Sequence, residues 1–152
     1  MCLLQLTYII SVPPNCRFEI DDAEDEWNYR QKFDYIHGRL LLSCFNNDFP
    51  AVIRKAYDAL NPGGWFELQD MLPPICFDDT WEGTEFKRWV ELTCEGAKAL
   101  GMDWYKVGNY KRWVEEAGFE EVTEFKSAAP TNTWPRGKHY KLLGAWMNQV
   151  SS

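Results

Sequence analysis

The stretch Ala51–Asp70 constrains the fold of this chain more than any other part of the sequence. Its first half places apolar residues at helical spacing, which predicts an amphipathic helix with one buried face. Those residues are Val52, Ile53, Ala56, Tyr57 and Leu60. Pro62 ends the helix, because the residue before a proline is disfavoured in the α region. Gly63 and Gly64 then allow a reversal into an apolar strand over residues 65–70, and we expect positive φ at one or both.

A second apolar strand is predicted just upstream, over Phe33–His37, so the chain reads strand, helix, strand. Such a unit forms two adjacent parallel strands with a right-handed crossover. We therefore expect an α/β fold in three layers, with helices on both faces of the sheet. In open sheets of this kind the ligand binds at the carboxyl ends of the strands. Those ends carry His37, Arg39, Gln69 and Asp70.

The remaining segments carry weaker signals. Short strands are predicted at Cys16–Ile20 and Phe119–Lys126, and helices over residues 81–100, 110–117 and 139–149. The segment Leu3–Ile10 is uncharged and has high β propensity. We expect it to pair with an open sheet edge, either within the chain or in a neighbouring chain, where it would give self-association.

The amino-acid composition argues against several kinds of binding protein. The 152 residues suit a single domain, and 16 basic against 23 acidic residues give a net charge of −7. This charge argues against binding to nucleic acid or to an anionic membrane surface. The five cysteines form no Cys-x-x-Cys pair and there are only two histidines, so no metal site is expected. The odd, widely spaced cysteines suit a reduced compartment, and we expect a cytoplasmic or nuclear location.

Four segments together resemble one known family. They read VPPNCRFEIDDA at 12–23, FDYIHGR at 33–39, LNPGGWFELQD at 60–70 and EAGF at 116–119. The combination resembles the S-adenosylmethionine (SAM)-dependent methyltransferases of the Rossmann-like class, and is especially similar to the LaeA-like group of fungal methyltransferases. The resemblance implies an incomplete Rossmann-like methyltransferase fold, with a mostly parallel sheet flanked by helices. It assigns residues 12–152 to a partial methyltransferase domain and leaves residues 1–11 as a non-family segment.

The resemblance also implies a SAM site. Asp21, Asp22 and Ala23 correspond to residues that lie against the adenine, with a carboxylate accepting a hydrogen bond from the exocyclic amine. His37 and Arg39 correspond to the next strand end, where Arg39 would pair with the carboxylate of SAM. His37 is in addition the candidate catalytic base, because histidine exchanges a proton near neutral pH.

Each of these residues also has a purely structural interpretation. The acidic run 21–26 can be a solvated turn, and His37 can be hydrogen-bonded locally. Arg39 can pair with Asp34 or Asp48 at the surface.

The family resemblance places the methyl acceptor beside the helix predicted over residues 81–100. An apolar acceptor pocket would be lined by Asp70, Trp81, Trp89 and Trp104. The structural alternative is that the tryptophans pack in an ordinary core.

Two diagnostic parts of the family site have no counterpart in the sequence. It contains no Gly-x-Gly, the loop that approaches the methionine end of SAM, and no acid for the ribose hydroxyls. We therefore expect the isolated chain to bind SAM weakly or not at all. The leading function is a SAM-dependent methyltransferase acting on a small molecule or protein. The alternatives are a catalytically inactive regulatory or partner-binding module, and an unstable truncated fragment.

Overall fold

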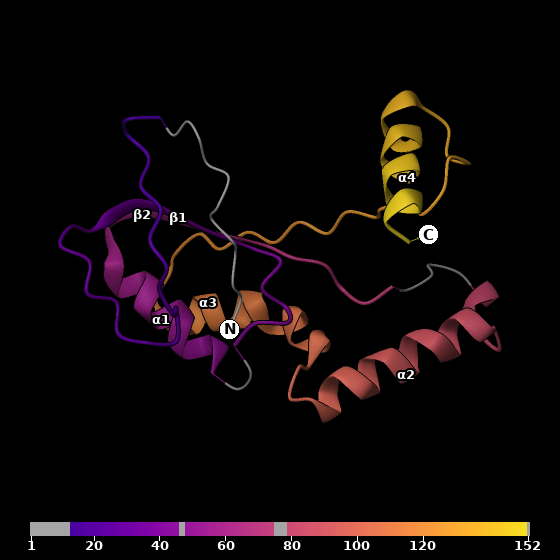
Figure 1. Cartoon of the computed structure of the whole chain (residues 1–152), viewed down its shortest axis with the longest axis horizontal. Coiled ribbons are helices and arrows are strands. Elements are labelled where there is room, and N and C mark those ends of the chain that lie inside the picture. The colour runs from indigo at the N-terminus through magenta and orange to yellow at the C-terminus, as the bar shows by residue number, and fades with distance from the viewer. Residues whose placement is uncertain (1–12, 46–47, 75–78, 152) are drawn as a thin grey trace. The chain divides into compact units, whose positions relative to one another are not determined.

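The computed structural model describes residues 13–45, 48–74 and 79–151, and the chain divides into two compact units (Figure 1). The first unit is Met1–Val122 and the second is Thr123–Ser152. The first unit contains β1 (Phe33–Arg39), α1 (Phe49–Ala59), β2 (Leu60–Gln69), the 3-10 helix η1 (Asp79–Trp81), α2 (Glu85–Ala99), the 3-10 helix η2 (Trp104–Asn109) and α3 (Tyr110–Ala117). The second contains α4 (Lys138–Ser151). The predicted pairing of Leu3–Ile10 lies outside the described residues, and the predicted boundary between residues 11 and 12 stays a prediction.

β1 and β2 are hydrogen-bonded neighbours in a parallel sheet, which confirms the predicted strand–helix–strand unit. Tyr35 lies opposite Trp65 at one end of the regular ladder, and Arg39 lies opposite Gln69 at the other. The register is irregular at the start of β2, where residues 61–64 bulge away from β1. Gly63 has a φ of +78°, so the predicted positive φ is confirmed at this residue.

Helix α1 buries only part of the predicted face. Tyr57 was predicted to be buried but is 40% exposed, and Leu60 was predicted in the helix but begins β2. The Asp48 carboxylate accepts a hydrogen bond from the backbone N–H of Ala51 at 3.1 Å and caps the first turn. The buried face consists of Phe49, Val52, Ile53 and Ala56. It packs with Phe66 and Leu68 of β2 and with Tyr110 and Ala117 of α3. The main core of the first unit therefore lies between one face of the sheet and the helices α1 and α3 (Figure 1).

The other face of the sheet is exposed. Tyr35 is 53% exposed and Trp65 is 75% exposed, and His37, Arg39 and Glu67 on the same face are exposed as well. The Tyr35 hydroxyl donates a hydrogen bond to the Glu67 carboxylate across the two strands. Within the first unit, no helix that the structure describes packs on this face, so the predicted three-layer arrangement is not seen in that unit.

Two predicted strands are also wrong. Cys16–Ile20 and Phe119–Lys126 contain no β-structure. Ile20 is 80% exposed and Phe125 is 90% exposed, so neither segment packs as a strand would. Both segments have strand-like composition, but a strand forms only where a neighbouring strand supplies hydrogen-bond partners.

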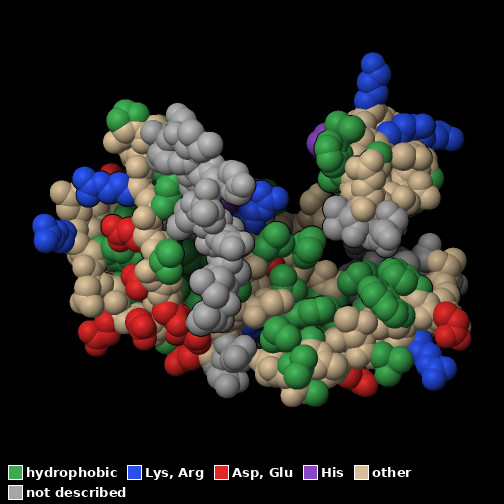
Figure 2. Space-filling view, in the orientation of Figure 1, with side chains coloured by type: hydrophobic (Ala, Val, Ile, Leu, Met, Phe, Trp, Pro, Cys, Tyr) green, Lys and Arg blue, Asp and Glu red, His purple; other side chains and the backbone are tan. Residues whose placement is uncertain are grey.

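The three predicted later helices are present, α3 with the predicted ends and α2 and α4 with shifted ends. α2 begins at Glu85 after Thr84, whose hydroxyl accepts a hydrogen bond from the N–H of Lys87 at 3.1 Å. α3 ends at Gly118, whose φ of +104° allows the chain to leave the helix. Figure 2 shows hydrophobic side chains exposed over α2. Phe86 and Trp89 of this helix are 48% and 58% exposed. No helix in the described ranges is long and apolar enough to cross a bilayer.

Candidate functional site

A cavity of about 220 Å³ lies beside β1 at its carboxyl end. Three residues predicted from the sequence line it together, namely Ala23, His37 and Arg39. Most of the remaining lining residues are apolar side chains of α1, the sheet and the loop after β1. These are Trp27, Ile36, Leu41, Phe45, Phe49, Val52, Ile53, Ala56, Phe66 and Leu68. The cavity is thus an apolar space, and His37 and Arg39 lie at its strand edge with their side chains on the other face of the sheet.

Asp21 and Asp22 do not line this cavity. The Asp21 carboxylate accepts from the backbone N–H of Asp22 at 3.0 Å, and the Asp22 carboxylate accepts from that of Glu24 at 2.9 Å. Both side chains are exposed. These contacts fit the alternative of a solvated turn, after which Ala23 lines the cavity. A contact of Asp21 or Asp22 with adenine stays a prediction.

His37 and Arg39 project from the exposed face of β1. The His37 ring lies parallel to that of Tyr35, with centroids 6.2 Å apart. Within the described residues Arg39 forms no ion pair with Asp34 or Asp48. The Asp34 carboxylate instead accepts from the side-chain amide of Asn61 at 2.8 Å, and Asp48 caps α1. The Arg39 guanidinium is therefore available to an anionic ligand.

Asp70 joins three parts of the first unit. One of its oxygens accepts from the backbone N–H of Leu41 at 2.9 Å and from the Tyr110 hydroxyl at 3.0 Å. The other accepts from the N–H of Met71 at 2.9 Å. Burial, and then the neighbouring Asp70 charge, raise the pKa of Tyr110 above its usual range. In the structure Asp70 holds the loop after β1 against α3, while its predicted place in a substrate pocket stays a prediction.

Lys106 was missed by the sequence analysis. Its ammonium group donates to the carbonyls of Cys44 and Phe45, at 2.5 and 3.1 Å, and lies 5.5 Å from the centre of the Phe49 ring. Burial lowers the pKa of Lys106. Like Asp70, this lysine fixes the loop that lines the cavity, and no spacing in the sequence marks it for that role.

The three predicted tryptophans are not part of the cavity beside β1. Trp81 packs edge-on against Phe86 with centroids 5.4 Å apart, and Phe86 stacks on Trp89 at 5.8 Å. Trp104 lies in η2, and its buried indole N–H has no hydrogen-bond partner in the part of the chain that is described. The structure therefore brings two of the tryptophans into one aromatic cluster, while their role around an acceptor stays a prediction.

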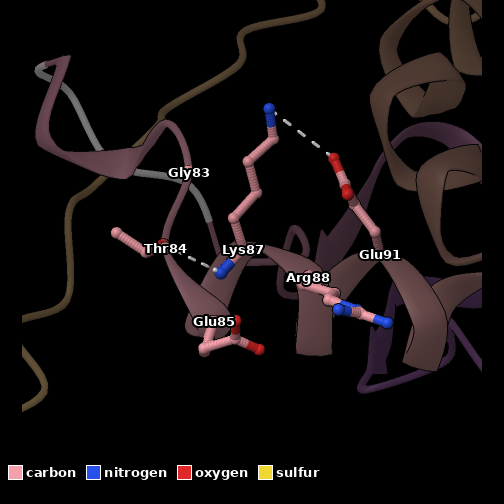
Figure 3. A pocket seen from close by; sticks show the side chains of 6 residues that line it. All are labelled: Gly83, Thr84, Glu85, Lys87, Arg88 and Glu91. Atoms are coloured by element: carbon pink, nitrogen blue, oxygen red, sulfur yellow. Dashed lines mark hydrogen bonds and ion pairs between the residues drawn. The ribbon is translucent and has the colours of Figure 1, made fainter.

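A larger cavity of about 390 Å³ lies at the start of α2 (Figure 3). Its lining is polar, and consists of Gly83, Thr84, Glu85, Lys87, Arg88 and Glu91. The Lys87 ammonium is already paired with Glu82 at 2.6 Å and with Glu91 at 3.7 Å, and Thr84 caps the helix. This space lies away from the strand ends and its lysine is neutralised, so we take the smaller cavity beside β1 as the candidate site.

A match to a family model shows which family this chain belongs to. The family model described as a methyltransferase domain matches residues 6–124. This chain belongs to that methyltransferase-domain family. The match confirms the resemblance seen in the four sequence segments, and it includes both strands and the candidate cavity.

Curated relatives of this methyltransferase domain are fungal. Methyltransferase pytC of Aspergillus terreus is 32% identical over 137 residues, covering 89% of this chain and 42% of the relative. Probable methyltransferase tdiE of Emericella nidulans is 32% identical over 130 residues, covering 84% and 40%. Secondary metabolism regulator laeA of Monascus pilosus is 28% identical over 144 residues, covering 91% and 39%. The chain spans less than half the length of these relatives, and no solved structure matches it.

Metal ligands are not clustered in this methyltransferase domain as far as the structure describes it. Residues 13–45, 48–74 and 79–151 contain no group of three His, Cys, Asp or Glu side chains that could hold a metal ion.

Proposed function

We propose that this methyltransferase domain binds the adenosine part of SAM in the cavity beside β1 and serves methyl transfer to a small molecule or a protein. One observation carries the proposal. Ala23 and His37 are separated by 14 positions in the sequence, yet both line one cavity with Arg39 at the carboxyl end of a parallel strand. This is the position at which open α/β sheets hold their ligands.

The lining of the cavity suits the two ends of such a cofactor. Its apolar side chains, including Phe49 and Ile53, can contact the flat face of an aromatic base. Arg39 carries a positive charge and makes no ion pair within the described residues, so it can pair with a carboxylate. Bound SAM would supply an electrophilic methyl group.

The chain's own contribution to catalysis is chiefly alignment. Methyl transfer from a sulfonium needs the acceptor to be held in line and water to be excluded. We propose His37, at the strand end, as the group that takes a proton from an acceptor that must lose one. Asp70 and Lys106 act indirectly, because they hold the loop after β1 against the rest of the cavity.

A second candidate function is a regulatory or partner-binding module without catalysis. The similarity to a protein named as a secondary metabolism regulator favours it. Cofactor binding without turnover would support this second function. A cytoplasmic or nuclear location belongs to both proposals, and the wide spacing of the cysteines supports it.

Saturation-transfer NMR with SAM tests the proposed site, because it detects weak ligands. We expect signal transfer to the adenine protons with a dissociation constant weaker than about 1 μM, equivalent to about −8 kcal/mol. The Ile36→Trp variant should lose most of this transfer, since the larger side chain would fill the cavity that Ile36 lines. The matched control is Tyr35→Trp, the same substitution on the exposed face of β1. Equal transfer in both variants would place the site elsewhere, and calorimetric binding tighter than micromolar would show that the expected weak affinity is wrong.

A further inference from the structure

One side chain of α1 holds the turn that precedes β1. The Lys55 ammonium group donates to the carbonyl oxygens of Glu24 and Asp25, at 2.5 and 2.9 Å. The two carbonyls lie 31 and 30 positions away in the sequence, and Lys55 itself is partly buried. Hydrogen bonds from a charged donor are stronger than those from a neutral one, so this pair of bonds attaches the turn firmly to the helix.

The attached turn closes on itself and forms part of the lining of the cavity beside β1. The backbone N–H of Asp25 donates to the carbonyl of Asp22 at 3.0 Å, and the indole N–H of Trp27 donates to the carbonyl of Ala23 at 3.1 Å. Ala23 and Trp27 both line the cavity, whereas Lys55 is not among its lining residues. The position of these two lining residues therefore depends on the carbonyls that Lys55 binds.

Helix α1 supplies another part of the same lining. Val52, Ile53 and Ala56 line the cavity from this helix, and all three are buried. Ile53 belongs to the core shared with α3, so the helix is fixed in the first unit. The bonds of Lys55 thus join a turn that has no regular secondary structure to a helix that is held by the core, and they set the spacing between two parts of the lining.

We propose that Lys55 is a positioning residue of the candidate SAM site, which holds the turn at residues 22–27 at the spacing from α1 that a flat base requires. The inference rests on the proposed function, in which the adenosine part of SAM occupies this cavity. Dispersion contacts depend steeply on distance, and a gap of about 0.5–1 Å already loses a quarter to a half of each contact. A turn released from Lys55 would therefore weaken binding without loss of any residue that lines the cavity.

An ion pair between Lys55 and the acidic run is the competing explanation. The side chains of Glu24 and Asp25 are exposed, and the ion pairs within the described residues do not include Lys55. The acceptors of the ammonium group are backbone carbonyls, which remain when the two acids are made neutral. The double variant Glu24→Gln/Asp25→Asn should therefore keep the attachment, while Lys55→Met, which retains the apolar stem, should lose it.

Hydrogen exchange of the full chain, measured by NMR, tests the attachment without a ligand. The probe is the Trp27 indole proton, assigned by its absence in a Trp27→Phe variant. We expect it to exchange about tenfold or more faster in Lys55→Met, because the turn opens more often. Lys55→Arg should restore slow exchange, since a guanidinium also offers several donors. The matched control is Lys111→Met, which removes an exposed lysine of α3. Unchanged exchange in Lys55→Met, or an equal increase in the double acid variant, would overturn the proposal.

Binding of adenosine and of SAM tests the consequence for the site. NMR titration of the Lys55→Met variant should give dissociation constants about tenfold weaker for both ligands, because both carry the part that the cavity would hold. Lys55→Arg, Lys111→Met and the double acid variant should bind like the unaltered chain. Faster indole exchange in Lys55→Met with unchanged dissociation constants would show that Lys55 holds the turn but does not position the ligand. Absence of binding to the unaltered chain would instead refute the proposed function, and this role of Lys55 with it.

Discussion

The Asp70→Ala variant should lose about 3 kcal/mol of unfolding free energy, because it leaves three hydrogen-bond donors without their acceptor. Two of those donors, the N–H of Leu41 and the hydroxyl of Tyr110, are partly buried and are not readily solvated. Urea denaturation followed by tryptophan fluorescence measures the change.

Glu67→Ala is the control for this loss. Glu67 also accepts a hydrogen bond from a tyrosine, Tyr35, but on the exposed face of the sheet. We expect it to cost less than about 0.5 kcal/mol, as exposed polar contacts do. The Tyr110→Phe and Tyr35→Phe variants make the same comparison, because each removes the hydroxyl that donates the hydrogen bond. Indistinguishable urea midpoints for Asp70→Ala and Glu67→Ala would show that Asp70 does not hold the loop after β1.

Valine at Gly64 should destabilise the first unit by about 2 kcal/mol or more, through overpacking at the bulge of β2. A Cβ there would lie 2.9 Å from the carbonyl oxygen of Asn61 and 3.2 Å from that of Asp34. Both oxygens belong to the backbone, so neither can move away as the end of a flexible side chain could. Valine at Gly63 should lower the free energy of unfolding by more than about 1 kcal/mol for a different reason. No atom lies within 4 Å of the added Cβ, but the φ of Gly63 is +78°, which strains a residue with a side chain.

Gly96→Val is the matched control for both glycines. Gly96 lies in α2, has open space around its Cα and has no positive φ. Valine there should change stability by less than about 0.5 kcal/mol, because its helix propensity is slightly better than that of glycine. If all three variants unfold at the same urea concentration, the bulge at residues 61–64 does not constrain the fold.

The local sequence pattern was sufficient to predict the central strand–helix–strand unit. The periodic apolar residues of α1, the cap at Asp48 and the break at Pro62 are all short-range signals, and the handedness of the crossover then makes β1 and β2 parallel neighbours. The resemblance of four segments to a methyltransferase domain also singled out Ala23, His37 and Arg39, which line one cavity, while their contact with a cofactor stays a prediction.

Contacts between distant segments were decided only by the tertiary structure. Cys16–Ile20 and Phe119–Lys126 have the composition of strands, but composition does not supply the neighbour that a strand requires. Asp70 and Tyr110 are 40 positions apart, and their hydrogen bond depends on α3 packing against α1. Short-range patterns determine where helices and turns form because their hydrogen bonds close within a few residues. The partners of a partly buried carboxylate depend instead on how whole elements pack, and for that reason no sequence pattern showed that Asp70 holds the loop after β1.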